Sequence, residues 1–229
     1  MTDLSNYLLS LGYDHSKVTD AIEKFKLYRS FLLEQNELFN LTAITDPHEV
    51  EIKHFIDSLA AIKYMKGEIM DIGSGAGFPA VPLSILCPDC KFTLVDSLNK
   101  RVDFLSRLVS LLDLDNCYAV HSRAEDLPKN KKYDVVVARA VSELNTLSEY
   151  CLPFVKTGGL FIAYKASDCD DEIKRASNAI KVLGGEIQSV EEFSVYSSDI
   201  VRKLVVIEKR NPTPEKYPRG SNKPKKQPL

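Results

Sequence analysis

The chain has 229 residues, of which 44% are hydrophobic and 27% are charged, and its formal net charge is −2. These values are typical of a soluble globular protein with one substantial core. No run approaches the roughly 20 apolar residues that span a bilayer, and the start of the chain lacks a secretion signal. Five cysteines, an odd number, fit reduced thiols better than a disulfide framework. We therefore expect a cytoplasmic protein without a membrane span, and a monomer.

Charge is unevenly distributed along the chain. Residues 210–229 carry six Lys or Arg and one acid, a net charge of +5, which leaves −7 on the rest. A basic tail on an acidic body indicates a polyanionic partner, or else a tail that only improves solubility.

The first 65 residues are predicted to be helical. Apolar residues recur at three- and four-residue steps over 17–39 and again over 47–65. Thr45-Asp46-Pro47 starts the second helix with a capping side chain and a proline. Asn40-Leu41-Thr42 lies in the connection between the two helices.

From Glu68 onward the pattern changes to alternating strands and helices. The expected strands are 69–72, 91–95, 118–121, 133–138, 159–165, 186–193 and 201–209, and the expected helices are 79–86, 100–112, 142–156 and 168–183. This alternation predicts an α/β fold with a doubly wound, mostly parallel sheet of seven strands and an antiparallel terminal hairpin. Residues 1–65 then form an N-terminal helical region, 66–210 a Rossmann-like domain, and 211–229 a basic Pro/Lys-rich tail that is mobile when free.

Chemistry-bearing residues follow the first two predicted strands. Gly73, Gly75 and Gly77 allow a sharp turn and a close approach of the backbone to a ligand. Asp96 ends the second strand, 23 residues after Gly73, where an acid accepts hydrogen bonds from ribose hydroxyls. The sequence therefore predicts a nucleoside-type cofactor at this sheet edge.

The identity of the cofactor rests on what surrounds the glycines. Dinucleotide sites use G-x-G-x-x-G at a helix start, whereas this loop reads G-x-G-x-G and is followed by Phe78-Pro79. Asp71 opens the loop, and an acid there suits a ligand with an ammonium and a sulfonium group better than a pyrophosphate. We expect S-adenosylmethionine. Asp71 alternatively only caps the loop.

Two further segments are candidates for this site. Arg139 ends the apolar fourth strand, where an arginine is costly unless it is paired or faces a cleft. It is either a structural ion pair or a contact to the methionine moiety or substrate base. Arg123-Ala124-Glu125-Asp126 follows the third strand, within reach of an adenine edge.

The ordered set of motifs resembles the bacterial 16S rRNA guanine-N7 methyltransferases, the RsmG family, formerly glucose-inhibited division protein B. The motifs are Asn40-Leu41-Thr42, His54-Phe55-Ile56-Asp57-Ser58, Asp71 to Pro79, Asp96-Ser97, Lys100-Arg101, Arg123-Ala124-Glu125 and Arg139-Ala140-Val141. The resemblance implies a class I S-adenosylmethionine-dependent methyltransferase whose target is a guanine in the 530 loop of 16S rRNA. It implies cofactor contacts from Gly73, Phe78, Ala124, Glu125 and Arg139, with Asp96 on the ribose.

The chemistry implied by this resemblance requires no conspicuous catalyst. Guanine N7 has a lone pair and no proton, so methyl transfer needs orientation and not a general base. We therefore assign no certain catalytic residue, with Arg139 as an orienting group, and we expect no metal. His54 and Asp57 share a helix face and either order the N-terminal region or form a structural pair. The sequence Cys87-Pro-Asp-Cys90 is interpreted as neither a redox nor a zinc motif.

The partner implied is 16S rRNA or the small ribosomal subunit. Candidate RNA-binding residues are Lys100, Arg101, Arg123, Lys165, Arg202 and Arg219. Three alternatives stay open, namely a small-molecule methyltransferase, a dinucleotide oxidoreductase and a non-catalytic RNA-binding module on the same fold.

Overall fold

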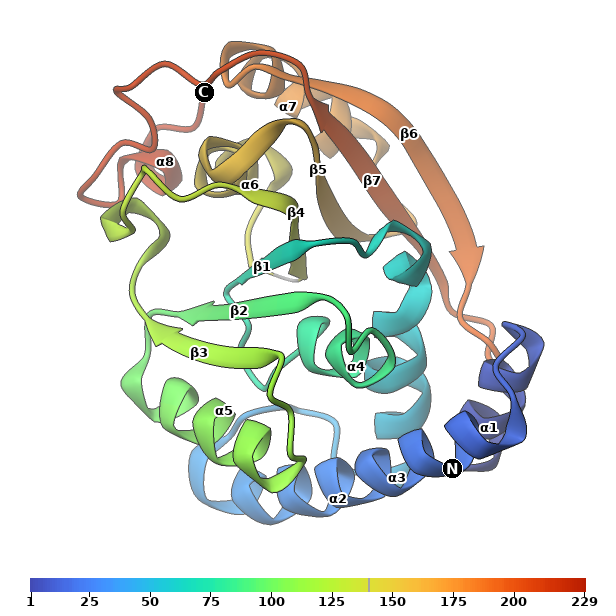
Figure 1. The fold of residues 1–229 in the computed structure, drawn as a ribbon. Helices are drawn as coiled ribbons and strands as arrows, with labels where there is room; N and C mark the ends of the chain where they lie inside the picture. Colours follow the sequence, from blue (N-terminus) through green and yellow to red (C-terminus); the bar gives the residue numbers. More distant parts are fainter. Residues whose placement is uncertain (140) are drawn as a thin grey trace.

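A computed structural model of the chain describes residues 1–139 and 141–229. Ala140, the middle residue of the Arg139-Ala140-Val141 motif, lies outside the described residues. The centre of the molecule is one twisted sheet of seven strands in the order β3-β2-β1-β4-β5-β7-β6 (Figure 1). The strands are β1 (Glu68–Ile72), β2 (Lys91–Asp96), β3 (Cys117–His121), β4 (Tyr133–Arg139), β5 (Val155–Ala166), β6 (Gly185–Ser194) and β7 (Val201–Lys209).

The first five strands are parallel, and β6 and β7 form the antiparallel hairpin at one edge. In the centre of the sheet, Asp71 of β1 is in register with Leu94 of β2 and Val137 of β4. The predicted seven-stranded fold with its antiparallel terminal hairpin is confirmed. Strand order reverses at β1, between β2 and β4, which is where open α/β sheets bind ligands.

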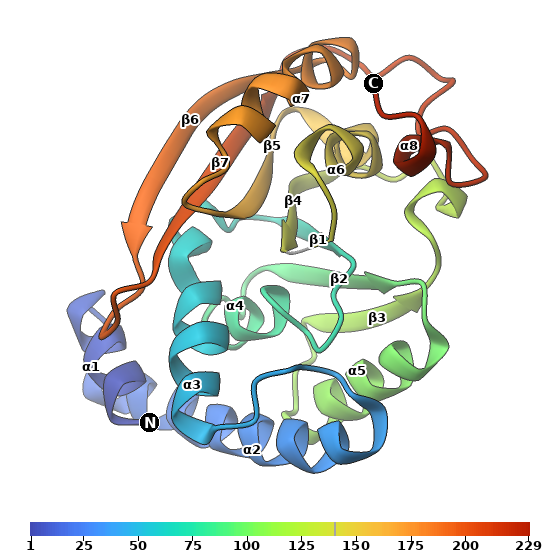
Figure 2. The same ribbon diagram turned by 180° about the vertical axis from the view of Figure 1, so that it is seen from behind.

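Helices cover both faces of the sheet (Figure 2). They are α1 (Thr2–Ser10), α2 (His15–Phe39), α3 (Pro47–Val50), η1 (Glu51–Ile56), η2 (Leu59–Tyr64), α4 (Ala80–Leu86), α5 (Asn99–Leu111), η3 (Ala124–Asp126), α6 (Leu144–Cys151), η4 (Leu152–Phe154), α7 (Asp170–Val182) and α8 (Lys223–Lys226). The N-terminal helices, α4 and α5 share one apolar core with one sheet face, and α6 and α7 share a second core with the other. The sheet is therefore doubly wound, as its alternating pattern predicted.

Two helix boundaries differ from the sequence expectation. The helix expected over 47–65 is a short α-helix followed by a π-helical turn and a 3₁₀ turn. Apolar spacing cannot separate these forms over segments of 4 to 6 residues, because each segment makes too few turns for the different helical periods to become visible. The helix expected over 142–156 spans only Leu144–Cys151, since Pro153 cannot donate within a helix and Val155 already pairs with Tyr133 as the start of β5.

The tail also differs from its expectation, because residues 211–229 fold back onto α6. Tyr217 is buried in the core beneath α6 and α7, and Pro224 is buried in α8. Composition does not predict this docking, because Glu149, which anchors Arg219, lies 70 residues away in sequence.

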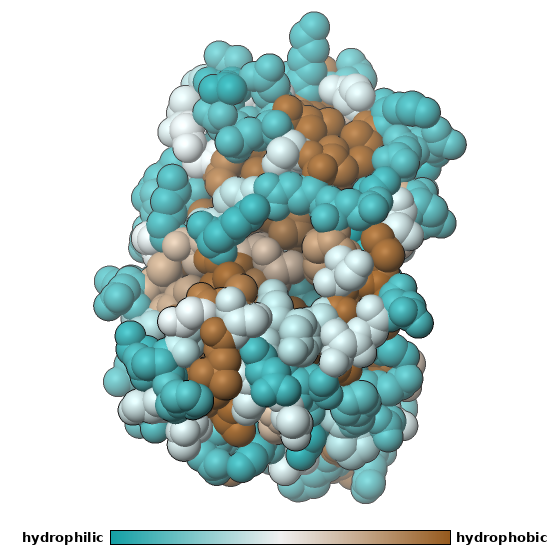
Figure 3. Space-filling model, turned by 90° about the vertical axis from the view of Figure 1, so that its right-hand side faces the viewer, coloured by the Kyte–Doolittle hydropathy of each residue, from teal (hydrophilic) through white to brown (hydrophobic). Residues whose placement is uncertain are grey.

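The edge strand β6 alternates half-buried and exposed side chains. The side of the molecule at the right of Figure 1 is covered mostly by hydrophilic side chains, with separate hydrophobic areas (Figure 3). Charged side chains along an edge strand prevent it from pairing with another sheet. No helix among residues 1–139 and 141–229 is long and apolar enough to cross a membrane.

Candidate functional site

A cavity of about 380 Å³ lies at the carboxyl ends of the central strands. Its walls come from the residues that end or follow β1, β2, β3 and β4. They include Ile72, Gly73, Val95, Asp96, Ser122, Arg123, Ala124, Glu125, Val141 and Ser142. Of the nine predicted cofactor residues, Gly73, Asp96, Ala124 and Glu125 meet in this cavity. A space of suitable size for a nucleoside therefore lies at the sheet edge where the cofactor was predicted.

Asp96 holds the glycine loop in place. Its Oδ2 accepts a hydrogen bond of 2.9 Å from the Gly75 amide, and its Oδ1 accepts one of 2.9 Å from the Leu98 amide at the start of α5. Arg101 Nη1 lies 3.5 Å from Oδ2. Each carboxylate oxygen has a second lone pair, so the buried Asp96 keeps acceptor capacity toward a ligand in the cavity.

Asp71 does not line this cavity, contrary to its expected place in the pocket wall. Its side chain is fully buried beneath the loop, where the Ser74 side chain and the Ala80 backbone face the carboxyl group. Burial raises the pKa of the Asp71 carboxyl to about 8, so the group is mostly protonated at neutral pH. The Gly75 amide of the loop is bonded to Asp96 and not to Asp71.

The glycines of the loop make room for neighbouring side chains. A Cβ on Gly73 would lie 2.6 Å from Val141, and one on Gly77 would lie 2.6 Å from the hydroxyl of Tyr28. Tyr28, from α2, donates a hydrogen bond of 2.5 Å to the Ala76 carbonyl. The loop is therefore held from the N-terminal region as well as from β2, and any larger residue at Gly73 or Gly77 would displace it.

Arg139 belongs to a second polar cluster, outside the cavity. Its Nη1 is 2.7 Å from Asp57 Oδ2, its Nη2 is 3.3 Å from His54 Nδ1, and its guanidinium lies over the Phe78 ring. Burial, and then the charge of Arg139, lower the pKa of His54 to about 3, so the imidazole is neutral. Because Nδ1 faces the Arg139 donor, the ring proton lies on Nε2 and is donated to Thr42 Oγ1 at 2.8 Å.

This cluster joins three motifs that are far apart in the sequence. Thr42, the His54–Ser58 segment and Arg139 meet at the loop through Phe78, whose ring stacks on the His54 ring at 4.4 Å. Arg139 therefore has the structural ion pair that the sequence left as one of two alternatives. Phe78, Gly75 and Gly77 also lie outside the cavity wall.

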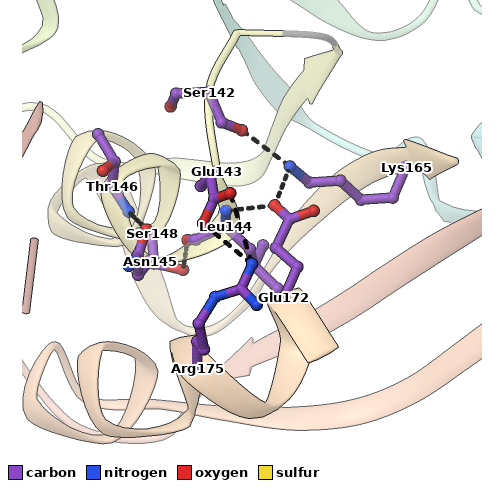
Figure 4. Close-up of polar contacts among 9 residues, drawn as sticks. All are labelled: Ser142, Glu143, Leu144, Asn145, Thr146, Ser148, Lys165, Glu172 and Arg175. Carbon is purple, nitrogen blue, oxygen red and sulfur yellow. Dashed lines mark hydrogen bonds and ion pairs between the residues drawn. The ribbon is translucent and has the colours of Figure 1, made fainter. Parts of the chain in front are cut away.

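A third group of contacts supports the segment after β4 (Figure 4). Lys165 of β5 donates to the Ser142 carbonyl at 2.8 Å and pairs with Glu172 of α7. Glu172 also accepts the Leu144 amide at the first residue of α6. These bonds hold Ser142 and the start of α6 against the cavity, and the Ser142 hydroxyl is buried without a partner in the described part of the chain.

The sequence reasoning also missed the cavity residues on α6 and in the tail, namely Thr146, Tyr150, Asn222 and Lys225. Thr146 and Tyr150 are four residues apart on α6, a spacing that places them on one face. This spacing could have identified the two residues as neighbours on α6 from the sequence alone. Asn222 and Lys225 lie in the tail, and nothing in the local sequence indicates where the tail docks.

The family profile described as rRNA small subunit methyltransferase G, named GidB, matches residues 21–201. The chain belongs to this family. It is 48% identical over 218 residues to the ribosomal RNA small subunit methyltransferase G of Alkaliphilus metalliredigens, covering 92% of this chain and 91% of that protein. Against the protein of the same name from Bacillus licheniformis it is 46% identical over 216 residues, covering 91% and 90%. The sequence-based identification of the family is confirmed.

Solved structures of other proteins share the fold of this rRNA small subunit methyltransferase G family member. NSun6 from Pyrococcus horikoshii with SFG superposes with a TM-score of 0.56 at 12% identity, covering 68% of this chain and 51% of that one. M. jannaschii TYW2 in complex with AdoMet gives 0.53 at 16% identity, covering 67% and 74%. At these identities the likeness shows the methyltransferase fold alone.

The basic residues expected to bind RNA fall into two groups. Lys100 and Arg123 are exposed, and Arg101 and Arg202 are partly exposed. Arg101 and Arg123 line the cavity, and Arg202 lies 3.8 Å from Asp57. Lys165 and Arg219, by contrast, are occupied by Glu172 and Glu149. Intramolecular pairing of these two cations argues against their role as RNA contacts. Across 1–139 and 141–229, the structure brings together no group of His, Cys, Asp and Glu side chains suited to a metal ion.

Proposed function

We propose that this chain transfers the methyl group of S-adenosylmethionine to N7 of a guanine in the 530 loop of 16S rRNA. The observation that carries the proposal is the cavity at the carboxyl ends of β1–β4, with Asp96 and Glu125 in its wall, in a member of the rRNA small subunit methyltransferase G family. Asp96 is proposed to accept hydrogen bonds from the ribose hydroxyls, as acids at this strand end do.

The cavity fits such a cofactor because it holds polar groups that lack partners. Glu125 Oε1 and Ser142 Oγ are buried and make no hydrogen bond to any described residue. A buried polar atom without a partner costs about 1–3 kcal/mol, which a ligand that satisfies it returns as affinity. We assign Glu125 to the amino edge of adenine, across the cavity from Asp96. Gly73 lines the cavity, and we place the methionine part of the cofactor beside its backbone.

The methyl group arrives on a sulfonium, which makes it a strong electrophile when the cofactor is bound. The side chains of this protein therefore have to orient the two reactants, a contribution of up to ~7–11 kcal/mol at best. No side chain has to remove a proton, because N7 of guanine carries none. The neutral His54, with its pKa of about 3, is suited to a fixed hydrogen-bonding role and not to acid catalysis.

Arg139 is proposed as the orienting group of the reaction. Asp57 and His54 fix its guanidinium over the Phe78 ring, and the loop that carries Phe78 also forms the cavity wall at Gly73. An arginine held on three sides positions that loop rigidly. The test is Arg139→Lys, which keeps the charge but not the planar fork, and we expect a fall in kcat with little change in cofactor affinity.

The target base must leave its helix or come from a loop. N7 of a paired guanine in A-form RNA lies in a deep, narrow groove that side chains do not reach. Arg123 in the cavity wall and the exposed Lys100 at the start of α5 are proposed to bind phosphates of such a splayed segment. Naked 16S rRNA, the small subunit and an assembly intermediate all present loops, and in vitro methylation of each in parallel distinguishes them.

The deciding experiment measures 7-methylguanosine in 16S rRNA by mass spectrometry, in cells with and without the protein, and maps the modified nucleotide. Loss of one 7-methylguanosine in the 530 loop supports the proposal, and an unchanged modification pattern refutes it. Purified protein with labelled S-adenosylmethionine separates this enzyme from a non-catalytic RNA-binding module. Transfer to small molecules and not to RNA would favour the other enzymatic alternative.

A calorimetric titration tests the cofactor site itself. Asp96→Ala removes charged hydrogen bonds worth ~1.5–3 kcal/mol each, so we expect S-adenosylmethionine to bind at least about tenfold more weakly. Asp103→Ala is the matched control, since it removes an exposed carboxylate from α5, outside the cavity. Tighter binding of NAD than of S-adenosylmethionine by the unmodified protein would point to an oxidoreductase.

A further inference from the structure

The ion pair between Arg219 and Glu149 fastens the end of the chain to α6. Glu149, on α6, is fully buried, and its Oε1 accepts from the Arg219 backbone amide at 2.8 Å and from Nε at 2.9 Å. Its Oε2 accepts from Arg219 Nη2 at 2.6 Å. Arg219 Nη2 also donates to the Gln227 carbonyl at 2.8 Å, which closes the segment on itself. We call residues 219–229 the C-terminal strap.

A second contact places the strap beside the cavity. Thr146, one turn before Glu149 on α6, donates to the Pro224 carbonyl at 3.1 Å. Thr146 and Tyr150 line the cavity from α6, and Asn222 and Lys225 line it from the strap. Both ribbon views show α8 against α6 at the same end of the sheet (Figures 1 and 2). The strap therefore closes one side of the space that the strand ends leave open.

We propose that the C-terminal strap is a wall of the cofactor cavity whose docking is coupled to cofactor binding, an inference that rests on the proposed function. A ligand that touches both α6 and the strap binds the docked state more tightly than the detached one. By linkage, the ligand then stabilises docking by the same factor by which docking improves affinity. The strap is suited to such coupling because detaching it exposes Glu149 to water and removes only the partly buried Leu229 from the edge of the second core.

This assignment changes the meaning of the basic tail. Arg219 serves as the anchor, and Lys225 faces the cavity, so two of its cations have roles within the protein. Lys223 and Lys226 are exposed on the same short helix and line no part of the cavity. Lys223 and Lys225 therefore form a matched pair, two residues apart on the same helix, of which only Lys225 lines the cavity.

The test uses S-adenosylhomocysteine as the probe and the full-length chain throughout. Calorimetry compares the unmodified protein with Arg219→Ala, Lys225→Ala and Lys223→Ala. We expect Arg219→Ala to weaken binding about tenfold, Lys225→Ala severalfold, and Lys223→Ala not measurably. Because Lys225 makes no anchoring contact, its variant keeps the test valid even if Arg219→Ala disturbs folding.

Hydrogen exchange provides the reciprocal readout. Saturating S-adenosylhomocysteine should slow exchange in a peptide covering 219–229 by at least fivefold, while a peptide covering 1–13, distant from the cavity, stays unchanged. Equal affinity in all three variants together with unchanged strap exchange would overturn the inference and leave the cofactor site standing. Failure of the unmodified protein to bind the probe would overturn both the site and the strap's role.

Discussion

The two ends of the chain both extend beyond the sheet and both support the edge of the sheet that carries the cavity, but they are held by different forces. The N-terminal helical region contributes Phe25, Tyr28, Leu32 and Phe55 to the same apolar core as β1 and β2, and all four side chains are fully buried. The C-terminal segment inserts Tyr217 under α6 and is then held by the Arg219–Glu149 pair.

This difference separates a permanent support from one that can open. Apolar burial is distributed over many contacts, so no local event releases the N-terminal helices without unfolding the core. The strap is held by the Arg219–Glu149 pair, the Thr146–Pro224 hydrogen bond and the partly buried Leu229, and regions with few apolar contacts open at low free-energy cost. The glycine loop is thus held rigidly by Tyr28 and Phe55 on one side, while the strap lines another part of the cavity.

Breaking the permanent support should have the largest effect. Phe55 packs against Phe25, Tyr28 and Phe78 with ring centroids 5.0, 5.1 and 6.0 Å away. We expect Phe55→Ala to lower the free energy of unfolding by ~3–5 kcal/mol in urea denaturation. Leu38→Ala, at a side chain that is 68% exposed in the same region, should change it by less than ~0.5 kcal/mol. Similar values for the two variants would contradict a shared core.

A pH titration examines the loop that lies between the two supports. The pKa of Asp71 is about 8 in the folded protein and ~3.9 when unfolded, so the folded state holds the extra proton between these values. Stability from this group is complete below pH ~4 and is lost as pH rises through 8. Relative to Asp71→Asn, wild-type stability should fall by ~2–3 kcal/mol from pH 5 to pH 7. A constant difference between the two proteins would show that Asp71 is ionised throughout.

The strap anchor should give a smaller effect that is confined to one pair. A double-mutant cycle with Arg219→Ala and Glu149→Gln isolates the coupling free energy, because the two side chains contact each other directly. We expect ~1.5–3 kcal/mol, the range for hydrogen bonds to charged groups. A coupling near zero in thermal or urea unfolding would mean that the tail is fastened by other contacts, such as Tyr217.

The exposed lysines of the strap that lie outside the cavity should matter least, and only for RNA. Replacing Lys223 and Lys226 by Ala removes at most two phosphate contacts. The slope of log affinity against log salt concentration should therefore fall by about 0.7 per contact on a single-stranded target. The same replacement at Lys17 and Lys26, exposed on α2, is the comparison at the other end of the chain. Equal slopes for all variants would leave the tail without an electrostatic role.

The sequence by itself determined the features that depend on neighbouring residues. The seven strands, the doubly wound order and the position of Gly73, Asp96, Ala124 and Glu125 at strand ends follow from local periodicity and glycine spacing. Residues at the carboxyl ends of parallel strands meet whatever the details of packing, so these four could be placed in one site before the structure was described. The sequence also assigned Gly75, Gly77 and Phe78 to the site, but it could not show that these residues lie outside the cavity wall.

Only the tertiary structure decided which charged groups pair. Arg139 meets Asp57 across 82 positions and Arg219 meets Glu149 across 70, and no local pattern predicts such encounters. The same holds for Asp71, whose side chain turns beneath the loop while Asp96 bonds the loop amide. Composition described the tail as solvated and mobile, yet buried Tyr217, buried Pro224 and the Arg219–Glu149 pair hold it against α6 beside the cavity. A buried charge demands a partner, and the fold alone determines which residue is close enough to supply it.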